Sequence, residues 1–143
     1  MNQGIVQTEQ DFNVAPEILW SAITDPVKMK EWFFSNIPAF RAEKGFSVSF
    51  DVKANDKIFE HQWKIIRVVP GRLIRYQWKY GDYPGNSQVT FEIFGEYPSS
   101  KLTLTHEGID SFPRGIPEFS RESCKQGWDY FIRDRLKKYL DDK

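Results

Sequence analysis

The chain has 143 residues, and its 20 lysines and arginines balance its 20 aspartates and glutamates. A chain without net charge has no overall field to attract phosphate backbones or anionic lipid, which argues against nucleic acid and membrane surfaces as partners. No stretch approaches the ~18 apolar residues of a membrane span, and the polar first ten residues do not resemble a secretory signal, so we expect a cytoplasmic protein.

The amino-terminal part of the chain predicts one strand followed by two short helices. Residues 4–14 read as a strand, with Val6, Thr8, Gln10, Phe12 and Val14 on one face. Pro16 then opens a helix, because proline is tolerated at the first helical position. The apolar stripe of this helix consists of Ile18, Leu19, Ala22 and Ile23. At Asp25-Pro26 the helix ends and a second one begins, with the aspartate as its cap, and it runs to about Trp32.

The residues between about Phe46 and Glu107 alternate apolar and polar side chains, as the strands of an antiparallel sheet with one wet face do. The expected strands cover residues 46–53, 58–69, 72–80, 89–93 and 102–106. Pro70-Gly71 makes a tight turn between the second and the third of these strands. We therefore predict a curved sheet whose apolar face needs a cover.

The last part of the chain predicts that cover. Pro117 and Glu118 start a helix of about 24 residues, which at 1.5 Å per residue reaches ~36 Å and crosses a whole sheet. Its apolar stripe consists of Phe119, Cys124, Trp128, Phe131, Ile132, Leu136, Tyr139 and Leu140. The expected fold class is α+β: a curved antiparallel sheet wraps a long carboxy-terminal helix, and two short helices follow the first strand.

Four segments carry a resemblance to a known family. They are PEILWSAITDPVKMKEW (Pro16 to Trp32), VVPGRLIRYQW (Val68 to Trp78), LTLTHEG (Leu102 to Gly108) and GWDYFIRDRLKKYL (Gly127 to Leu140). In order and spacing the chain resembles the activator of heat-shock protein 90 ATPase homologue-like family of the SRPBCC superfamily. This resemblance implies one helix-grip domain over residues 1–143, the fold shared by birch pollen allergen and START domains. Gly127 is expected to let the final helix approach its neighbour closely.

The two histidines of the chain, His61 and His106, both point toward the covered face of the sheet by the alternation of their strands. They could hydrogen-bond a ligand or exchange a proton near neutral pH. Alternatively, each is a core histidine satisfied by a neighbouring group. The aromatic residues expected around them, as pocket walls or as a solid core, are Trp63, Tyr76, Trp78, Phe91, Trp128 and Phe131.

Trp32, Phe33 and Phe34 follow the second short helix, where this fold commonly has a cavity mouth. They are expected either to gate entry or to cap the edge of the core. The sequence holds no nucleophile elbow, phosphate loop or zinc pattern, so we assign no catalytic residue, metal or cofactor. The single cysteine, Cys124, is expected to be a buried, inert thiol.

Three functions remain open at this point, and we rank them in the following order. The first is a non-catalytic binding module that holds a small hydrophobic ligand between the sheet and the long helix. The second, implied by the family resemblance, is an interaction protein that modulates a chaperone or another stress-response partner, which an exposed apolar surface near residues 32–34 would favour. The third is a cyclase or dehydratase acting on a polyketide-like substrate, and it rests on fold analogy.

Overall fold

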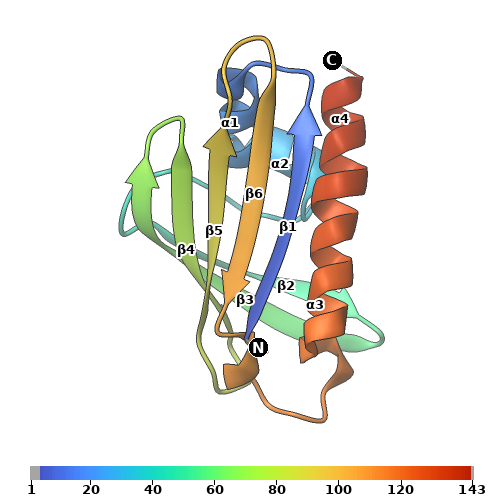
Figure 1. Ribbon diagram of the computed structural model, residues 1–143. Helices are drawn as coiled ribbons and strands as arrows, with labels where there is room; N and C mark the ends of the chain where they lie inside the picture. The colour runs from blue at the N-terminus through green and yellow to red at the C-terminus, as the bar shows by residue number, and fades with distance from the viewer. Residues whose placement is uncertain (1–3, 143) are drawn as a thin grey trace.

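Six antiparallel strands form one curved sheet in the computed structural model, which describes residues 4–142. The strands are β1 (Ile5–Phe12), β2 (Ser47–Ala54), β3 (Lys57–Val69), β4 (Leu73–Tyr80), β5 (Ser87–Phe94) and β6 (Ser100–Glu107). They lie in the order β1-β6-β5-β4-β3-β2, so β1 and β2 form the two edges. Figure 1 shows the long carboxy-terminal helix running beside β1.

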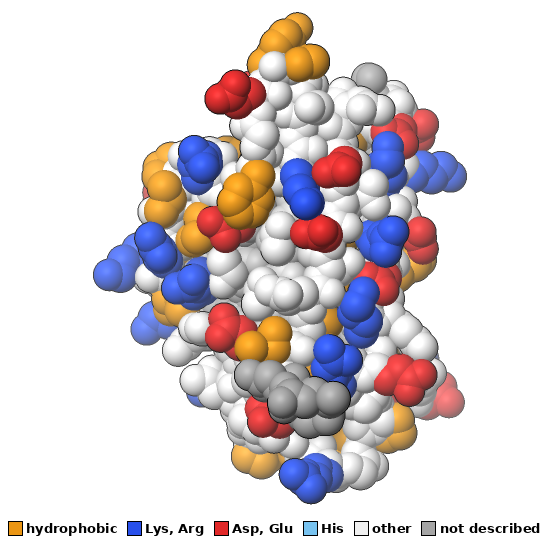
Figure 2. All heavy atoms as spheres, viewed as in Figure 1, with side chains coloured by type: hydrophobic (Ala, Val, Ile, Leu, Met, Phe, Trp, Pro, Cys, Tyr) orange, Lys and Arg blue, Asp and Glu red, His pale blue; other side chains and the backbone are white. Residues whose placement is uncertain are grey.

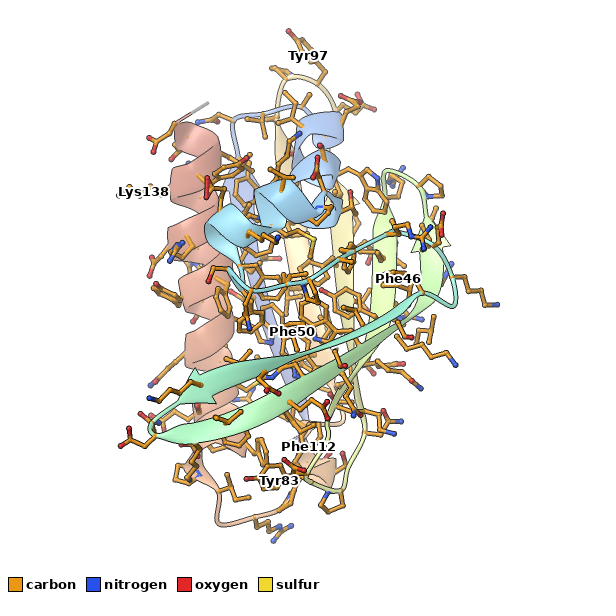
Figure 3. The ribbon with its side chains drawn as sticks, turned by 180° about the vertical axis from the view of Figure 1, so that it is seen from behind. Phe46, Phe50, Tyr83, Tyr97, Phe112 and Lys138 are labelled. Atoms are coloured by element: carbon orange, nitrogen blue, oxygen red, sulfur yellow. The ribbon has the colours of Figure 1, made fainter. Side chains whose placement is uncertain are left out.

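The strand register confirms the predicted alternation of faces. His61, Trp63 and Ile65 of β3 are buried, and they lie opposite Tyr80, Trp78 and Tyr76 of β4, respectively. The register shifts between Ile65 and Arg67, and such an irregularity bends a strand. On the hairpin side of this shift, β2 and β3 slant across the front of the other strands toward the lower end of the long helix, as Figure 3 shows.

Two short helices, α1 (Pro16–Thr24) and α2 (Pro26–Trp32), connect β1 to β2 as predicted. The Asp25 side chain caps α2 by accepting a hydrogen bond of 2.9 Å from the backbone N–H of Val27. Leu19, Ala22 and Ile23 of the predicted α1 stripe are buried. Ile18 is an exception, because its side chain is half exposed.

The long helix is confirmed, but it begins later than predicted. Pro117–Phe119 form a separate 3₁₀ turn, and α3 (Arg121–Trp128) starts after Ser120, whose hydroxyl accepts a hydrogen bond from the Ser123 N–H. The helix therefore covers 21 residues, through to α4 (Lys137–Asp141). The expected start was wrong because Phe119 is buried in an aromatic cluster beside the sheet, which fixes the chain ahead of the cap.

The middle of the long helix, Asp129–Leu136, is π-helical. The buried residues of the whole long helix follow one another at intervals of four: Trp128, Ile132, Leu136 and Leu140. In a regular α-helix, three steps of four residues would carry this stripe about 120° around the axis. The wider turn of a π-helix offsets that drift, so one helix face stays against the sheet over its whole length.

Aromatic rings fill most of the space between the sheet and the helices. Phe33 lies at the centre, with its ring stacked 4.7 Å from Trp32 and edge-on to Phe131 of the long helix at 4.9 Å. Figure 3 shows Phe50 in the middle of this layer. We call this cluster, which is centred on Phe33, the filled core.

The outer surface carries charges of both signs, interspersed over the face that Figure 2 shows. Within residues 4–142 no helix is long and apolar enough to cross a membrane. The first three residues of the amino terminus, considered above for a secretory signal, lie outside the described part of the chain.

Candidate ligand cavity

A cavity of about 90 Å³ lies at the lower end of the molecule, between the long helix, β4, β6 and the turns that precede the helix. It is lined by Phe34, Trp78, Tyr80, His106, Ile109, Phe112, Glu118, Phe119, Cys124, Gly127, Trp128 and Phe131. Figure 3 places Phe112 and Tyr83 together at this end. We call the cavity and the neighbouring cluster of Phe59, Phe112 and Phe119 the hollow end.

The irregular segment between β6 and the long helix supplies one wall of the cavity. Two 3₁₀ turns, Ile109–Ser111 and Pro117–Phe119, bring Phe112 and Phe119 against Tyr80. The Tyr80 ring stacks on Phe119 at 4.7 Å and meets Phe112 edge-on at 5.0 Å. Tyr80 also packs against the filled core, so it stands between the two clusters.

Half of the predicted ligand-binding residues line this cavity: Trp78, His106, Trp128 and Phe131. The other four, His61, Trp63, Tyr76 and Phe91, are buried in the filled core. Of the three residues expected at the mouth, Phe34 lines the cavity, whereas Phe33 lies inside the filled core. Trp32 is fully buried, and its indole N–H donates to the Ala22 carbonyl at 2.8 Å.

Several lining residues were missed by the sequence reasoning. Tyr80 had a usable signal, because it shares the alternation of Tyr76 and Trp78. Phe112 had none, since it lies beside a turn without a regular period. Phe119 was predicted on the apolar stripe of the long helix, but it lies in the separate turn ahead of that helix. Gly127 was assigned to close packing of the helix, but an added Cβ there would meet no heavy atom within 4 Å. Its side of the helix faces open space instead.

His106 is held in one tautomer by its partners. The Trp128 indole N–H donates to Nδ1 at 3.0 Å, so Nδ1 carries no proton and Nε2–H must be the donor. Nε2 donates to the Ser87 hydroxyl at 2.8 Å, and that hydroxyl donates onward to the Trp78 carbonyl at 2.6 Å. Burial lowers the pKa of His106 to about 3. This histidine is therefore neutral and fully hydrogen-bonded at neutral pH.

His61 lies in the filled core beside the cavity wall. Its Nδ1–H donates to the Phe59 carbonyl of its own strand at 3.1 Å, and its ring meets Tyr80 edge-on at 5.0 Å. Burial lowers the pKa of His61 to about 4, although the hydrogen bond to Phe59 opposes this shift. His61 is therefore also neutral at neutral pH, and it supports the cavity wall rather than lining the cavity.

Cys124 and Tyr80 place a thiol and a phenol in the cavity wall. The Cys124 sulfur lies 3.4 Å from Nδ1 of His106, and burial raises the pKa of the thiol to about 12. Burial also raises the pKa of Tyr80, although the hydrogen bond that its oxygen accepts from the Trp78 indole opposes the rise. Both groups stay protonated at neutral pH, so the thiol is not a nucleophile.

Glu118 connects the cavity wall to the tip of the β2–β3 hairpin. Its two carboxylate oxygens accept hydrogen bonds of 3.0 Å from the Asn55 amide and from the Lys57 ammonium. The bond from Asn55, together with the one from Lys57, holds the pKa of Glu118 below its usual value. Its side chain is partly exposed, so this ionised group lies where the cavity meets solvent.

The titratable groups of the cavity keep one protonation state around neutral pH, so the wall offers fixed dipoles and aromatic surface.

Two further polar atoms, the Trp63 Nε1 and the Tyr76 hydroxyl, are buried in the filled core without a hydrogen-bond partner. Within residues 4–142 no three His, Cys, Asp or Glu side chains gather as a metal site would require.

A curved antiparallel sheet that wraps a long carboxy-terminal helix, with an aromatic cavity between them, defines a helix-grip protein of the SRPBCC type. Comparison with known families makes the assignment narrower. The family described as "Activator of Hsp90 ATPase homolog 1-like protein" matches residues 13–141, and the chain belongs to this family. No curated protein matches the chain.

Solved structures share this fold at low sequence identity. Protein CV1439 from Chromobacterium violaceum is 20% identical, with a TM-score of 0.80, and the match covers 96% of this chain and 97% of that one. The Aha1 dimer from Colwellia psychrerythraea is 18% identical, with a TM-score of 0.71 and 95% of both chains covered. DynU16, from the dynemicin biosynthetic locus, is 22% identical with a TM-score of 0.74, over 96% of this chain and 47% of its own.

Proposed function

We propose that this protein binds a small hydrophobic molecule in the cavity at the hollow end and does not transform it. The observation that carries this proposal is the composition of the wall, where aromatic rings surround a few polar groups whose protonation is fixed. Pockets for small molecules typically have such walls. General acid–base catalysis, in contrast, is most efficient when a group has its pKa near the working pH.

The size of the cavity limits the proposed ligand. Drug-sized ligands occupy pockets of about 300–1,000 Å³, and a dry apolar cavity of about 150 Å³ accommodates benzene. The free volume of about 90 Å³ therefore suits a molecule of one small ring or a short chain. A larger ligand would have to displace side chains such as Phe34 or Phe131, which are two of the partly buried aromatic residues in the wall.

The first test compares native and denaturing mass spectra of freshly purified protein. We expect extra mass in the native spectrum that is lost on unfolding, and its value would identify the chemistry of the ligand. The Gly127→Leu variant provides the matched control. Its side chain would extend into the open space of the cavity, so the extra mass should be absent from its native spectrum. A native mass equal to that of the bare chain, in wild type and variant alike, would contradict the proposal.

The role of an interaction protein has less support from the described residues. The feature named for it, an exposed apolar surface at residues 32–34, is not formed, because Trp32 and Phe33 are buried and Phe34 is partly buried. The family name and the Aha1 neighbour keep a chaperone among the partners to test. Co-precipitation with the chaperone, together with a changed rate of its ATP turnover, would move the assignment to that role.

A further inference from the structure

The Tyr80 hydroxyl has a proton that no group in the cavity accepts, and this bears on which ligand the proposed function involves. The hydroxyl oxygen accepts the Trp78 indole N–H at 2.9 Å. Within residues 4–142 the structure shows no hydrogen bond in which this hydroxyl is the donor. A phenol can both accept and donate, so half of its capacity is unused.

The other polar groups in the wall are already committed. His106 uses both ring nitrogens, and the Trp128 indole donates to one of them. The thiol of Cys124 points at the same nitrogen, and both oxygens of Glu118 are occupied by the β2–β3 hairpin. A molecule entering the cavity therefore meets one uncommitted strong donor, the O–H of Tyr80.

Tyr80 is also held firmly in place. Phe119 stacks on its ring at 4.7 Å, Phe112 and His61 meet the ring edge-on at 5.0 Å, and the Trp78 N–H fixes the oxygen. A donor that is already positioned loses little conformational freedom when it bonds a ligand. Such a donor discriminates between a ligand with an acceptor and one without, because an unmatched polar group in a buried site costs free energy.

We infer that the cavity selects an uncharged, ring-sized molecule that carries a hydrogen-bond acceptor, such as a carbonyl or ether oxygen, and that Tyr80 donates to this acceptor. The inference rests on the proposed function. Charged molecules are disfavoured because an ion in an aromatic cavity loses its hydration. The Glu118–Lys57 ion pair adds no net charge that would attract an ion, and a cation would have to compete with Lys57, which already bonds that carboxylate.

The test uses two probes of nearly equal shape on the full-length wild-type protein: cyclopentanone, which has a carbonyl oxygen, and methylenecyclopentane, which has a CH₂ group in its place. Binding is followed through the indole N–H resonances of Trp78 and Trp128 in ¹⁵N-labelled protein. We expect the ketone to bind about fivefold more tightly. We also expect it to shift the Trp78 resonance more than the alkene does, because bonds in a chain polarise one another.

The Tyr80→Phe variant should lose the preference for the ketone and bind both probes about equally. The matched Tyr83→Phe variant should keep the preference. Tyr83 belongs to the same aromatic cluster but does not line the cavity. Equal binding of both probes to wild type would overturn the inference and leave the proposed function intact. Tighter binding of tetramethylammonium than of the ketone would overturn it in favour of a cation site. If neither probe shifts either resonance, the proposed function itself fails.

Discussion

The filled core and the hollow end are built from the same kind of residue but differ in how the chain presents it. In the filled core, Phe33 contacts rings from the sheet and from the long helix, and regular elements supply those partners. At the hollow end, two short 3₁₀ turns supply Phe112 and Phe119, and an open volume of about 90 Å³ remains. Regular elements allow close packing here, whereas the irregular connection leaves space that a ligand can use.

The largest expected effect comes from truncating a side chain in the filled core. The Trp32→Ala variant should lower the free energy of unfolding by about 3–5 kcal/mol, because it opens a cavity among packed rings and removes a buried hydrogen bond. Urea denaturation followed by circular dichroism measures this change. Tyr97→Ala, on an exposed loop that Figure 3 shows at the far end, is the control and should change stability by less than about 0.5 kcal/mol. A small effect of Trp32→Ala would show that the core is not close-packed.

The second prediction concerns the two buried histidines, one in each region. Their pKa values of about 4 for His61 and about 3 for His106 lie below the usual 6.5, so the unfolded chain takes up protons first as the pH falls. Stability is therefore complete above pH 6.5 and is lost below it. We expect a fall of about 2–3 kcal/mol between pH 7 and pH 5.5, measured by urea denaturation.

The matched variant for this pH effect is His61→Leu, which removes one of the two histidines. Its loss of stability between pH 7 and pH 5.5 should be about half that of the wild type. If the unfolding free energy stays constant over this range in the wild type, both histidines have ordinary pKa values and are not desolvated.

The third prediction tests where the long helix begins at the hollow end. The Ser120→Ala variant loses the hydroxyl that accepts the Ser123 N–H, and it should lower stability by about 1 kcal/mol. Ser123→Ala is the control, since only the backbone of that residue takes part in the cap, and its effect should be near zero. Thermal unfolding of the two variants decides the point. Equal effects would favour a start at Pro117, as the sequence alone suggested.

The strands could be read from the sequence, whereas the cavity could not. Period-two alternation predicted that His61, Trp63 and Ile65 share one buried face, because the pleat fixes side-chain direction locally. The wall that Phe112 and Phe119 form depends on turns without a period, and the free volume depends on how neighbouring rings fit together. Neither the position of this wall nor the free volume beside it is encoded in local spacing. The sequence alone therefore left a solid core and a pocket as equal alternatives.

The smallest expected effect is a gain in stability, and it separates the two regions most directly. At the hollow end, Gly127→Ala adds a methyl group where no heavy atom lies within 4 Å of the new Cβ. Alanine is also the better helix former, so we expect stability to rise by about 0.5–1 kcal/mol. In the filled core, Ala22→Val adds bulk at a buried helix position and should cost about 1–3 kcal/mol by overpacking. Calorimetry on both variants should give opposite signs. A loss for Gly127→Ala would mean that the open space beside the helix is filled in solution, and the cavity proposed as the ligand site would then not exist in the free protein.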